Sequence, residues 1–116
     1  MDVRAATKTG TKSGTTTTAY VEALRIDTRG CGVQGKLLLV IKNLHSSNSM
    51  KYKIDGYPYD IDGTLGGLAV AIKGETSIAG SAQVTQTDVD KGYAAVVVSV
   101  IKDSDVGTYQ IDYTTY

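Results

Sequence analysis

The run at 93–102, YAAVVVSVIK, constrains the fold more than any other stretch of the sequence. Its valines are β-branched and stiff at χ1, so they pack well on a pleated surface and predict a strand. Both faces of this strand are apolar. One carries Val96, Val98 and Val100, and the other carries Ala95, Val97 and Ile101. Because such a strand usually lies in a sheet that is covered on both sides, we expect it at the centre of the domain.

A second strand is predicted at 108–116. Its side chains alternate, with Tyr109, Ile111 and Tyr113 on one side and Gln110, Asp112 and Thr114 on the other. This alternation indicates a strand with one buried face. The intervening residues 103–107, DSDVG, supply turn chemistry, because Asp bonds the nearby backbone and Gly tolerates positive φ. The sequence therefore predicts a C-terminal hairpin.

Five further strands are predicted at 19–28, 36–44, 50–55, 68–72 and 83–87. The uninterrupted apolar run Leu37–Ile41 predicts a strand buried on both faces, whereas Met50–Asp55 alternates and predicts one wet face. We expect these two strands to pair as a hairpin through the loop 45–49. Residues 73–81 are interpreted as a turn region with room for one helical turn at Ser77–Ser81.

No stretch of ten or more residues has the apolar period of an amphipathic helix. About seven or eight strands joined by Gly, Ser and Asp clusters predict an all-β fold. We expect an antiparallel β-sandwich, Ig-like or jelly-roll-like, as a single domain over 19–116. A barrel is the alternative, because it shows the same strand alternation. The polar, Thr-rich residues 1–18 are predicted to form an N-terminal arm or an edge strand.

Composition excludes several classes of function. The chain has 116 residues, with 12 basic and 12 acidic side chains and no net charge, so a basic face for nucleic acid is not expected. Cys31 is the only cysteine, which excludes an intrachain disulfide and a cysteine zinc site. The start of the chain, MDVRAATKTG, has no apolar segment, and no apolar run reaches the roughly 20 residues of a membrane span. We expect a protein made in the cytoplasm and not bound to a membrane.

The sequence offers little catalytic chemistry. His45 is the only histidine and lies among serines in a predicted loop. Nucleophilic catalysis needs a base beside the nucleophile, and no G-x-S-x-G motif or dinucleotide fingerprint is present. We therefore predict that the protein is not an enzyme and needs no cofactor.

Two binding hypotheses follow from residues 52–62. Asp60 and Asp62 lie beside glycines and could ligate a structural calcium ion, although the EF-hand spacing fails. Asp is also frequent in turns for its own hydrogen-bonding reasons. Tyr52, Tyr57 and Tyr59 could line a carbohydrate platform, or they could serve in packing and subunit contacts, where tyrosine is enriched.

The stretch Val96–Ile111 resembles the E–F corner of immunoglobulin-like domains. Val96, Val98, Ile101, Asp105, Gly107 and Tyr109 fall on the family pattern, with Ile111 in the cysteine place. The resemblance implies a tyrosine corner in which the Tyr109 hydroxyl bonds upstream backbone. The family's disulfide and core Trp are absent here.

The whole chain resembles the small, Thr- and Gly-rich β-sandwich proteins of tailed-phage virions, such as capsid decoration (cement) proteins. The stretches GETSIAGSAQ, TDVDKGYAAVVVSV and GTYQIDYTTY carry this resemblance. It implies a non-enzymatic structural protein of the virion, which binds the major capsid protein or another virion protein, forms homo-oligomers such as trimers, and stabilises the shell. The contacts we expect are Arg4, Lys8 and Lys12 in the arm, and Tyr57 and Tyr59. A carbohydrate-binding or adhesive module is the alternative.

Overall fold

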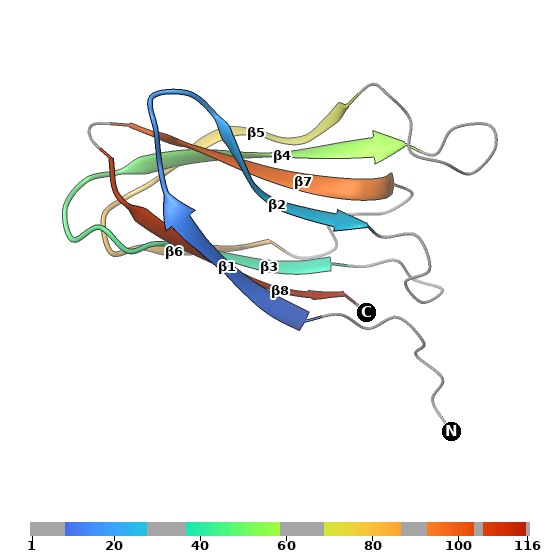
Figure 1. Ribbon diagram of the computed structural model, residues 1–116, viewed down its shortest axis with the longest axis horizontal. Coiled ribbons are helices and arrows are strands. Elements are labelled where there is room, and N and C mark those ends of the chain that lie inside the picture. Colours follow the sequence, from blue (N-terminus) through green and yellow to red (C-terminus); the bar gives the residue numbers. More distant parts are fainter. Residues whose placement is uncertain (1–8, 28–36, 59–68, 87–92, 104–105, 116) are drawn as a thin grey trace.

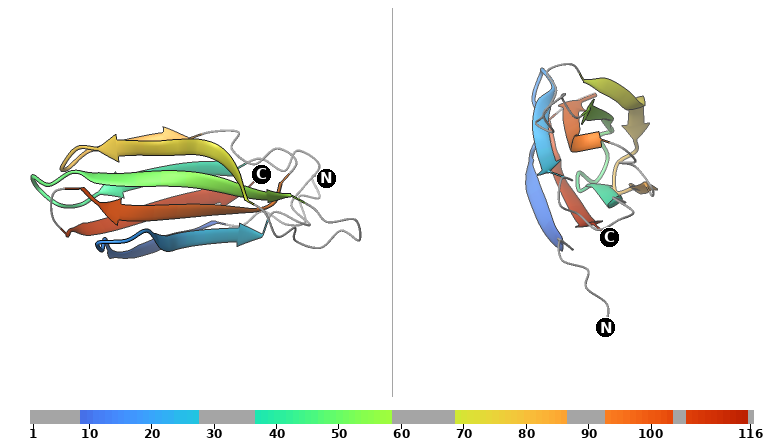
Figure 2. Two further views of the ribbon diagram at one scale, coloured as in Figure 1. Left: turned by 90° about the horizontal axis from the view of Figure 1, so that it is seen from above. Right: turned by 90° about the vertical axis from the view of Figure 1, so that its right-hand side faces the viewer.

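The computed structural model describes residues 9–27, 37–58, 69–86, 93–103 and 106–115, which form eight strands and no helix (Figure 1). The strands are β1 (Thr9–Thr15), β2 (Val21–Asp27), β3 (Leu37–Asn43), β4 (Met50–Pro58), β5 (Val70–Ile78), β6 (Gln83–Gln86), β7 (Tyr93–Lys102) and β8 (Thr108–Thr115). They make two antiparallel sheets of four strands. Sheet A has the order β1-β8-β3-β6, and sheet B has the order β2-β7-β4-β5. The end-on view in Figure 2 shows the two sheets as stacked layers.

The pairing of the strands is nested. β1 pairs with β8, β2 with β7, β3 with β6 and β4 with β5, so the chain behaves as one long antiparallel ribbon rolled into two sheets. This is the topology of the eight-stranded jelly roll. The predicted β-sandwich is confirmed, and the strand order selects the jelly-roll form over the Ig-like one. Both sheets keep two edge strands, so the fold is not a closed barrel.

Two predicted hairpins are wrong. β7 and β8 lie in different sheets, so they do not form the predicted hairpin. β3 and β4 are also in different sheets, with residues 44–49 crossing between them. An alternating strand fixes which residues share a face, but a turn with the same chemistry can lead to a neighbour or to the opposite layer.

The burial of β3 and the extent of β5 also differ from prediction. Leu37, Leu39 and Ile41 are fully buried, whereas Leu38 and Val40 between them are half-buried on the outer face of sheet A. The predicted turn region 73–81 is wrong for 73–78, where strand β5 continues through Ile78, and right for Gly80 and Ser81, which form a turn. The helical turn predicted at Ser77–Ser81 is wrong. The predicted strand at 50–55 is confirmed and extends to Pro58, with buried and half-buried residues alternating along it.

The core lies between the inner faces of the two sheets. Its buried members are Leu24, Ile26, Leu37, Leu39, Ile41, Met50, Tyr52, Ile54, Ile78, Val96, Val98, Val100, Tyr109 and Ile111. Full burial of one such aliphatic side chain stabilises the fold by about 1.5–3 kcal/mol. The prediction for β7 is confirmed, since every residue from Ala95 to Val100 is buried.

Asn43 fastens the connections at one end of the sandwich. Its buried carboxamide nitrogen donates to the carbonyl oxygens of Asn48, Ile78 and Ala79 at 2.7, 3.1 and 3.2 Å. Its carboxamide oxygen accepts the backbone N–H of His45 at 3.0 Å. One side chain thus joins the β3–β4 and β5–β6 connections, which satisfies buried polar groups that would otherwise destabilise the fold.

No helix that could span a membrane occurs in the part of the chain that the structure describes.

Candidate interaction face on sheet B

The outer face of sheet B has small side chains along its central strand. Ala95, Val97 and Ser99 of β7 point to this outer face, yet they are only 3%, 5% and 9% exposed. The strands on either side, β2 and β4, supply the long side chains that surround them. The apolar outer face of β7 is thereby shielded without a third layer of secondary structure.

A pair of Arg25 and Tyr57 links the two flanking strands. The guanidinium carbon of Arg25 on β2 lies 5.1 Å from the ring centroid of Tyr57 on β4, within the range of a cation–π interaction. Arg25 and Val97 are register partners, and Tyr57 is opposite Ala95. The pair therefore spans β7 above the small side chains of Ala95 and Val97.

A β-bulge in β2 orients this arginine. The register shifts between Glu22 and Leu24, so that Glu22 pairs with Ser99 and Arg25 with Val97, both on the outer face. Without the extra residue, positions 22 and 25 would lie on opposite faces of a regular strand. The bulge lets the Glu22 carboxylate accept a 2.7 Å hydrogen bond from Nε of Arg25.

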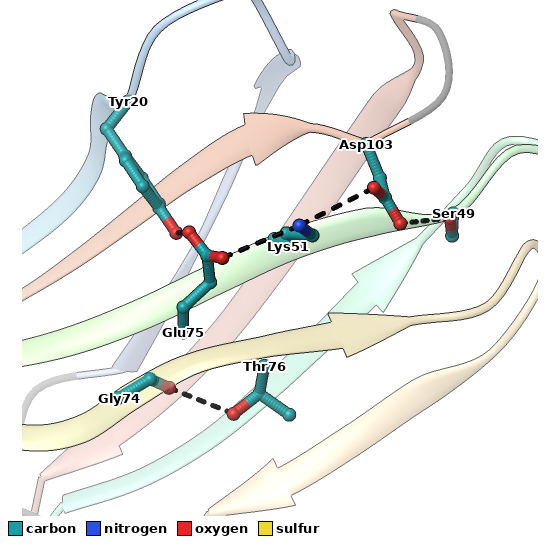
Figure 3. A network of polar contacts seen from close by, with 7 residues as sticks. All are labelled: Tyr20, Ser49, Lys51, Gly74, Glu75, Thr76 and Asp103. Atoms are coloured by element: carbon teal, nitrogen blue, oxygen red, sulfur yellow. Dashed lines mark hydrogen bonds and ion pairs between the residues drawn. The ribbon is translucent and has the colours of Figure 1, made fainter.

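A second pair, Tyr20 and Lys53, lies further along the same face. The Lys53 ammonium is 4.4 Å from the Tyr20 ring centroid. The Tyr20 hydroxyl donates to the carboxylate of Glu75 on β5 (Figure 3). Burial, and then this hydrogen bond, raise the pKa of Tyr20. The same bond lowers the pKa of Glu75 below its ordinary value. Tyr20 thus ties the start of β2 to the far edge of sheet B.

Lys51 extends this network toward the end of the sandwich. Its ammonium lies 3.5 Å from the carboxylate of Glu75 and 3.7 Å from that of Asp103, which also accepts a 2.6 Å hydrogen bond from Ser49 (Figure 3). The side chains involved are between a third and a half exposed, so each ion pair contributes little stability alone. Their effect is to hold tyrosine, lysine and carboxylate groups in fixed positions on one surface.

The outer face of sheet A carries a hollow. This hollow of about 330 Å³ is lined by Gly10, Thr11, Leu38, Val40, Asp112, Tyr113 and Thr114. The Asp112 carboxylate accepts from Lys42 at 2.9 Å, Thr11 at 2.8 Å and Gln110 at 3.1 Å. These donors, Lys42 first, lower the pKa of Asp112. With most of its acceptor capacity already used, this carboxylate has little left for a ligand.

The residues predicted as sites fall into separate parts of the molecule. Tyr57 lies on the sheet B face, whereas Lys12 is exposed on β1 in sheet A, so the structure does not bring these two onto one surface. The other expected contacts, Arg4, Lys8 and Tyr59, and the expected calcium ligands Asp60 and Asp62, lie outside the described residues. Within the described ranges, no three His, Cys, Asp or Glu side chains gather in a way that could hold a metal ion.

The carbohydrate platform needs a correction. Tyr52 is 1% exposed in the core, and its hydroxyl accepts a 3.0 Å hydrogen bond from Gln86, so it cannot stack on a sugar at the surface. Sequence reasoning missed Tyr20, Arg25 and Lys53. No local pattern marks them, because they meet only through strand pairing and the β2 bulge.

Tyr109 packs across the sheet. Its ring lies over Gly14 of the neighbouring strand β1, where an added Cβ would be 2.6 Å from the tyrosine hydroxyl. Burial raises the pKa of this hydroxyl. Tyr109, which falls on the Ig-like sequence pattern, thus makes a cross-strand contact within sheet A of a jelly roll.

The fold and this face define an all-β jelly-roll protein whose outer sheet surface holds ordered aromatic and charged side chains. No family model matches the sequence, and no curated protein matches it. Among solved structures, the chain is similar to the Yersinia pseudotuberculosis-derived mitogen, with a TM-score of 0.60, 14% identity, and coverage of 96% of this chain and 88% of that one. It is also similar to a protein of Bacillus endospore appendages, with a TM-score of 0.52, 10% identity, and coverage of 95% and 86%. These likenesses show a shared fold.

A prophage protein gives a weaker match. The SPBc2 prophage-derived protein YomS aligns with a TM-score of 0.49 and 16% identity, over 93% of this chain and 94% of that one.

Proposed function

We propose that the domain is a non-enzymatic structural or adhesive protein that docks on a larger assembly through the outer face of sheet B. The observation that carries the proposal is the cation–π pair of Arg25 and Tyr57, which spans β7. Arg25 is held in place by its hydrogen bond to Glu22. Arg and Tyr are enriched among the residues that dominate binding energy at protein interfaces. Because these side chains are already fixed in the free domain, docking would cost less conformational entropy than ordering free side chains.

The assembly we propose is a virion, with the domain as a capsid decoration (cement) protein that binds the major capsid protein or another virion protein. The resemblance of the chain to such proteins supports this choice. Bacillus endospore appendages, which share the fold, form disulfide-linked pili, so a jelly roll of this size is compatible with assembly into a larger structure. On this proposal the protein is a homo-oligomer located in the virion.

Co-sedimentation with capsids tests the docking face. Purified chain is mixed with tailed-phage capsids that lack it, and the bound fraction is compared for wild type, Arg25→Ala and Tyr57→Ala. We expect each variant to bind about tenfold or more weakly, the effect of losing an interface hot spot. Gln83→Ala and Thr85→Ala, exposed on sheet A, are matched controls that should bind normally. Wild-type binding by both sheet B variants would refute the docking face.

Carbohydrate binding is the second candidate function, and the positions of Tyr20 and Tyr57 on one open face favour it. Aromatic faces stack on sugar rings, although each of these rings already has a cation on one side. A glycan array probed with wild type and Tyr57→Ala would distinguish this function. Binding that the substitution abolishes supports it, and silence of the array opposes it.

Calcium binding at Asp60 and Asp62 is a separate proposal that rests on their spacing beside glycines. A bound ion stabilises the folded state, so EDTA should lower the Tm if the site is real. An unchanged Tm in EDTA opposes a structural calcium ion.

A further inference from the structure

Strand β1 has no apolar side chains to anchor it in the core. Its sequence, TGTKSGT, has no aliphatic or aromatic side chain. It lies at the edge of sheet A, and among the described strands it pairs with β8 alone. Polar, glycine-containing strands of this kind are prone to swapping between copies of a chain. Hydrogen bonding with β8, over the seven pairs from Thr9–Thr114 to Thr15–Thr108, therefore holds β1 in place.

Two tyrosines of β8 fit the glycines of β1. A Cβ added to Gly10 would lie 2.6 Å from the hydroxyl of Tyr113, and one added to Gly14 would lie 2.6 Å from the hydroxyl of Tyr109. Real Cβ contacts are not this short, so each ring occupies the space that a side chain would need. The edge of β8 therefore selects a strand with the pattern Gly-x-x-x-Gly, and β1 supplies it.

The connection between β1 and β2 has an anchor at each end. Thr16 is 1% exposed, and its N–H donates to the carbonyl oxygen of Gly107 at 2.8 Å, while Gly107 N–H donates to Thr16 Oγ1 at 3.0 Å. Tyr20 is fixed to the body of sheet B by Lys53 and Glu75.

The three residues between these anchors, 17–19, are all exposed. Among the described residues, they make one backbone hydrogen bond with the rest of the domain, in which the N–H of Lys102 donates to the carbonyl oxygen of Thr17 at 3.0 Å. This is the arrangement of a hinge.

We propose that β1 exchanges between copies of this chain. In the exchanged form, β1 of one copy lies on β8 of a second copy in the same register. Gly10 and Gly14 then lie under the second copy's tyrosine rings, and Thr16 bonds to its Gly107. Every contact of β1 is reproduced, so only the hinge 17–19 changes conformation and the exchange becomes favourable as concentration rises. The exchange joins copies of the chain at sheet A and is independent of docking through sheet B.

A mixed-chain disulfide tests the exchange directly. Ser13 and Gln110 are opposite each other on β1 and β8, and opposed residues in antiparallel strands have Cα atoms within the range that a disulfide spans. One chain carries Ser13→Cys, a second carries Gln110→Cys, and both carry Cys31→Ser. Co-refolded at high concentration and oxidised, they should give a covalent dimer of twice 12.2 kDa. Either chain alone should give none.

A single chain with both cysteines is the geometric control, since its intrachain disulfide shows that the positions can be bridged. If this control oxidises fully while the mixed chains give no covalent dimer, the exchange proposal is overturned. Deleting Thr18 is a second test, because it should change the fraction of dimer only if β1 exchanges between copies. A shortened hinge cannot fold back as readily, so the dimer fraction in sedimentation should rise several-fold. An unchanged fraction contradicts the assignment of the hinge.

Discussion

The backbone N–H of Asn48 donates to Nδ1 of His45 at 2.8 Å. The N–H of Ser47 donates to the same nitrogen at 3.0 Å. Nδ1 of the imidazole is the acceptor for two backbone N–H groups of the same connection. The only imidazole in the chain thus closes the β3–β4 connection, as an Asx side chain closes a turn, and this explains its place in the loop.

Replacing His45 should therefore loosen this connection. His45→Ala removes the acceptor of two backbone N–H groups, and we expect it to lower the free energy of unfolding by about 1–2 kcal/mol. His45→Asn keeps an acceptor at a similar reach and should restore about half of the loss. Urea unfolding of the three proteins measures both effects. Equal stability of the Ala and Asn variants would show that the imidazole stabilises the turn by packing on Gly107 instead of by accepting these bonds.

Gly80 and Gly74 should respond in opposite ways to alanine. A Cβ on Gly80 would lie 2.7–2.8 Å from backbone atoms of Ser47, and backbone cannot rotate away as a side chain can. We expect Gly80→Ala to destabilise the fold by about 1–3 kcal/mol. Gly74 in β5 has nothing within 4 Å of the added atom, so Gly74→Ala should be neutral or stabilise by up to about 1 kcal/mol. Thermal unfolding of the pair tests the prediction, and similar Tm values would contradict it.

The positions of the strands along the chain could be predicted from the sequence more easily than the pairing of each strand with its neighbours in a sheet. The alternation along Met50–Asp55 indicates one buried face, and the valines of β7 indicate two. Burial of this kind can be predicted from each strand by itself. Whether 103–107 leads to a hairpin or to the opposite sheet depends on contacts far away in the chain. The start of β5 falls in the strand predicted at 68–72, but its continuation does not look like a strand in the sequence. β5 is an edge strand with most side chains exposed, so its stretch KGETS carries no apolar signal.

The candidate face was predictable only in part. Tyr57 could be singled out as a contact residue, but its partner Arg25 could not. Their contact depends on β7 separating β2 from β4, and on a bulge that turns Arg25 to the same side as Glu22. Neither the strand order nor the bulge produces a periodic sequence pattern from which this contact could be predicted.

Asn43 should be among the least replaceable polar residues. Asn43→Ala would leave the carbonyl oxygens of Ile78 and Ala79, and the N–H of His45, without this partner in a largely buried place. Buried groups left unsatisfied cost about 1–3 kcal/mol each, so we expect a loss of several kcal/mol. Gln83→Ala, an exposed amide on β6, is the matched control and should change stability by less than about 0.5 kcal/mol. A loss for Asn43→Ala no larger than that of the control would mean that water replaces the carboxamide.

The carboxylate of Asp112 should make stability fall at acid pH. Its pKa is lowered in the folded protein, first by the hydrogen bond from Lys42 and then by those from Thr11 and Gln110. For a lowered folded pKa, the stabilisation is fully present above the unfolded value of about 3.9 and is lost as pH falls through the folded value. Asp112→Asn removes the titrating group, so its free energy of unfolding should fall less steeply below about pH 4 than that of wild type.

Glu75 has a lowered pKa as well and contributes in the same window, so the variant should retain some acid dependence. Urea unfolding at a series of pH values measures the two slopes. The prediction fails if they coincide, because Asp112 would then titrate alike in the folded and unfolded chains. In that case the bonds from Lys42, Thr11 and Gln110 would be formed only transiently in solution.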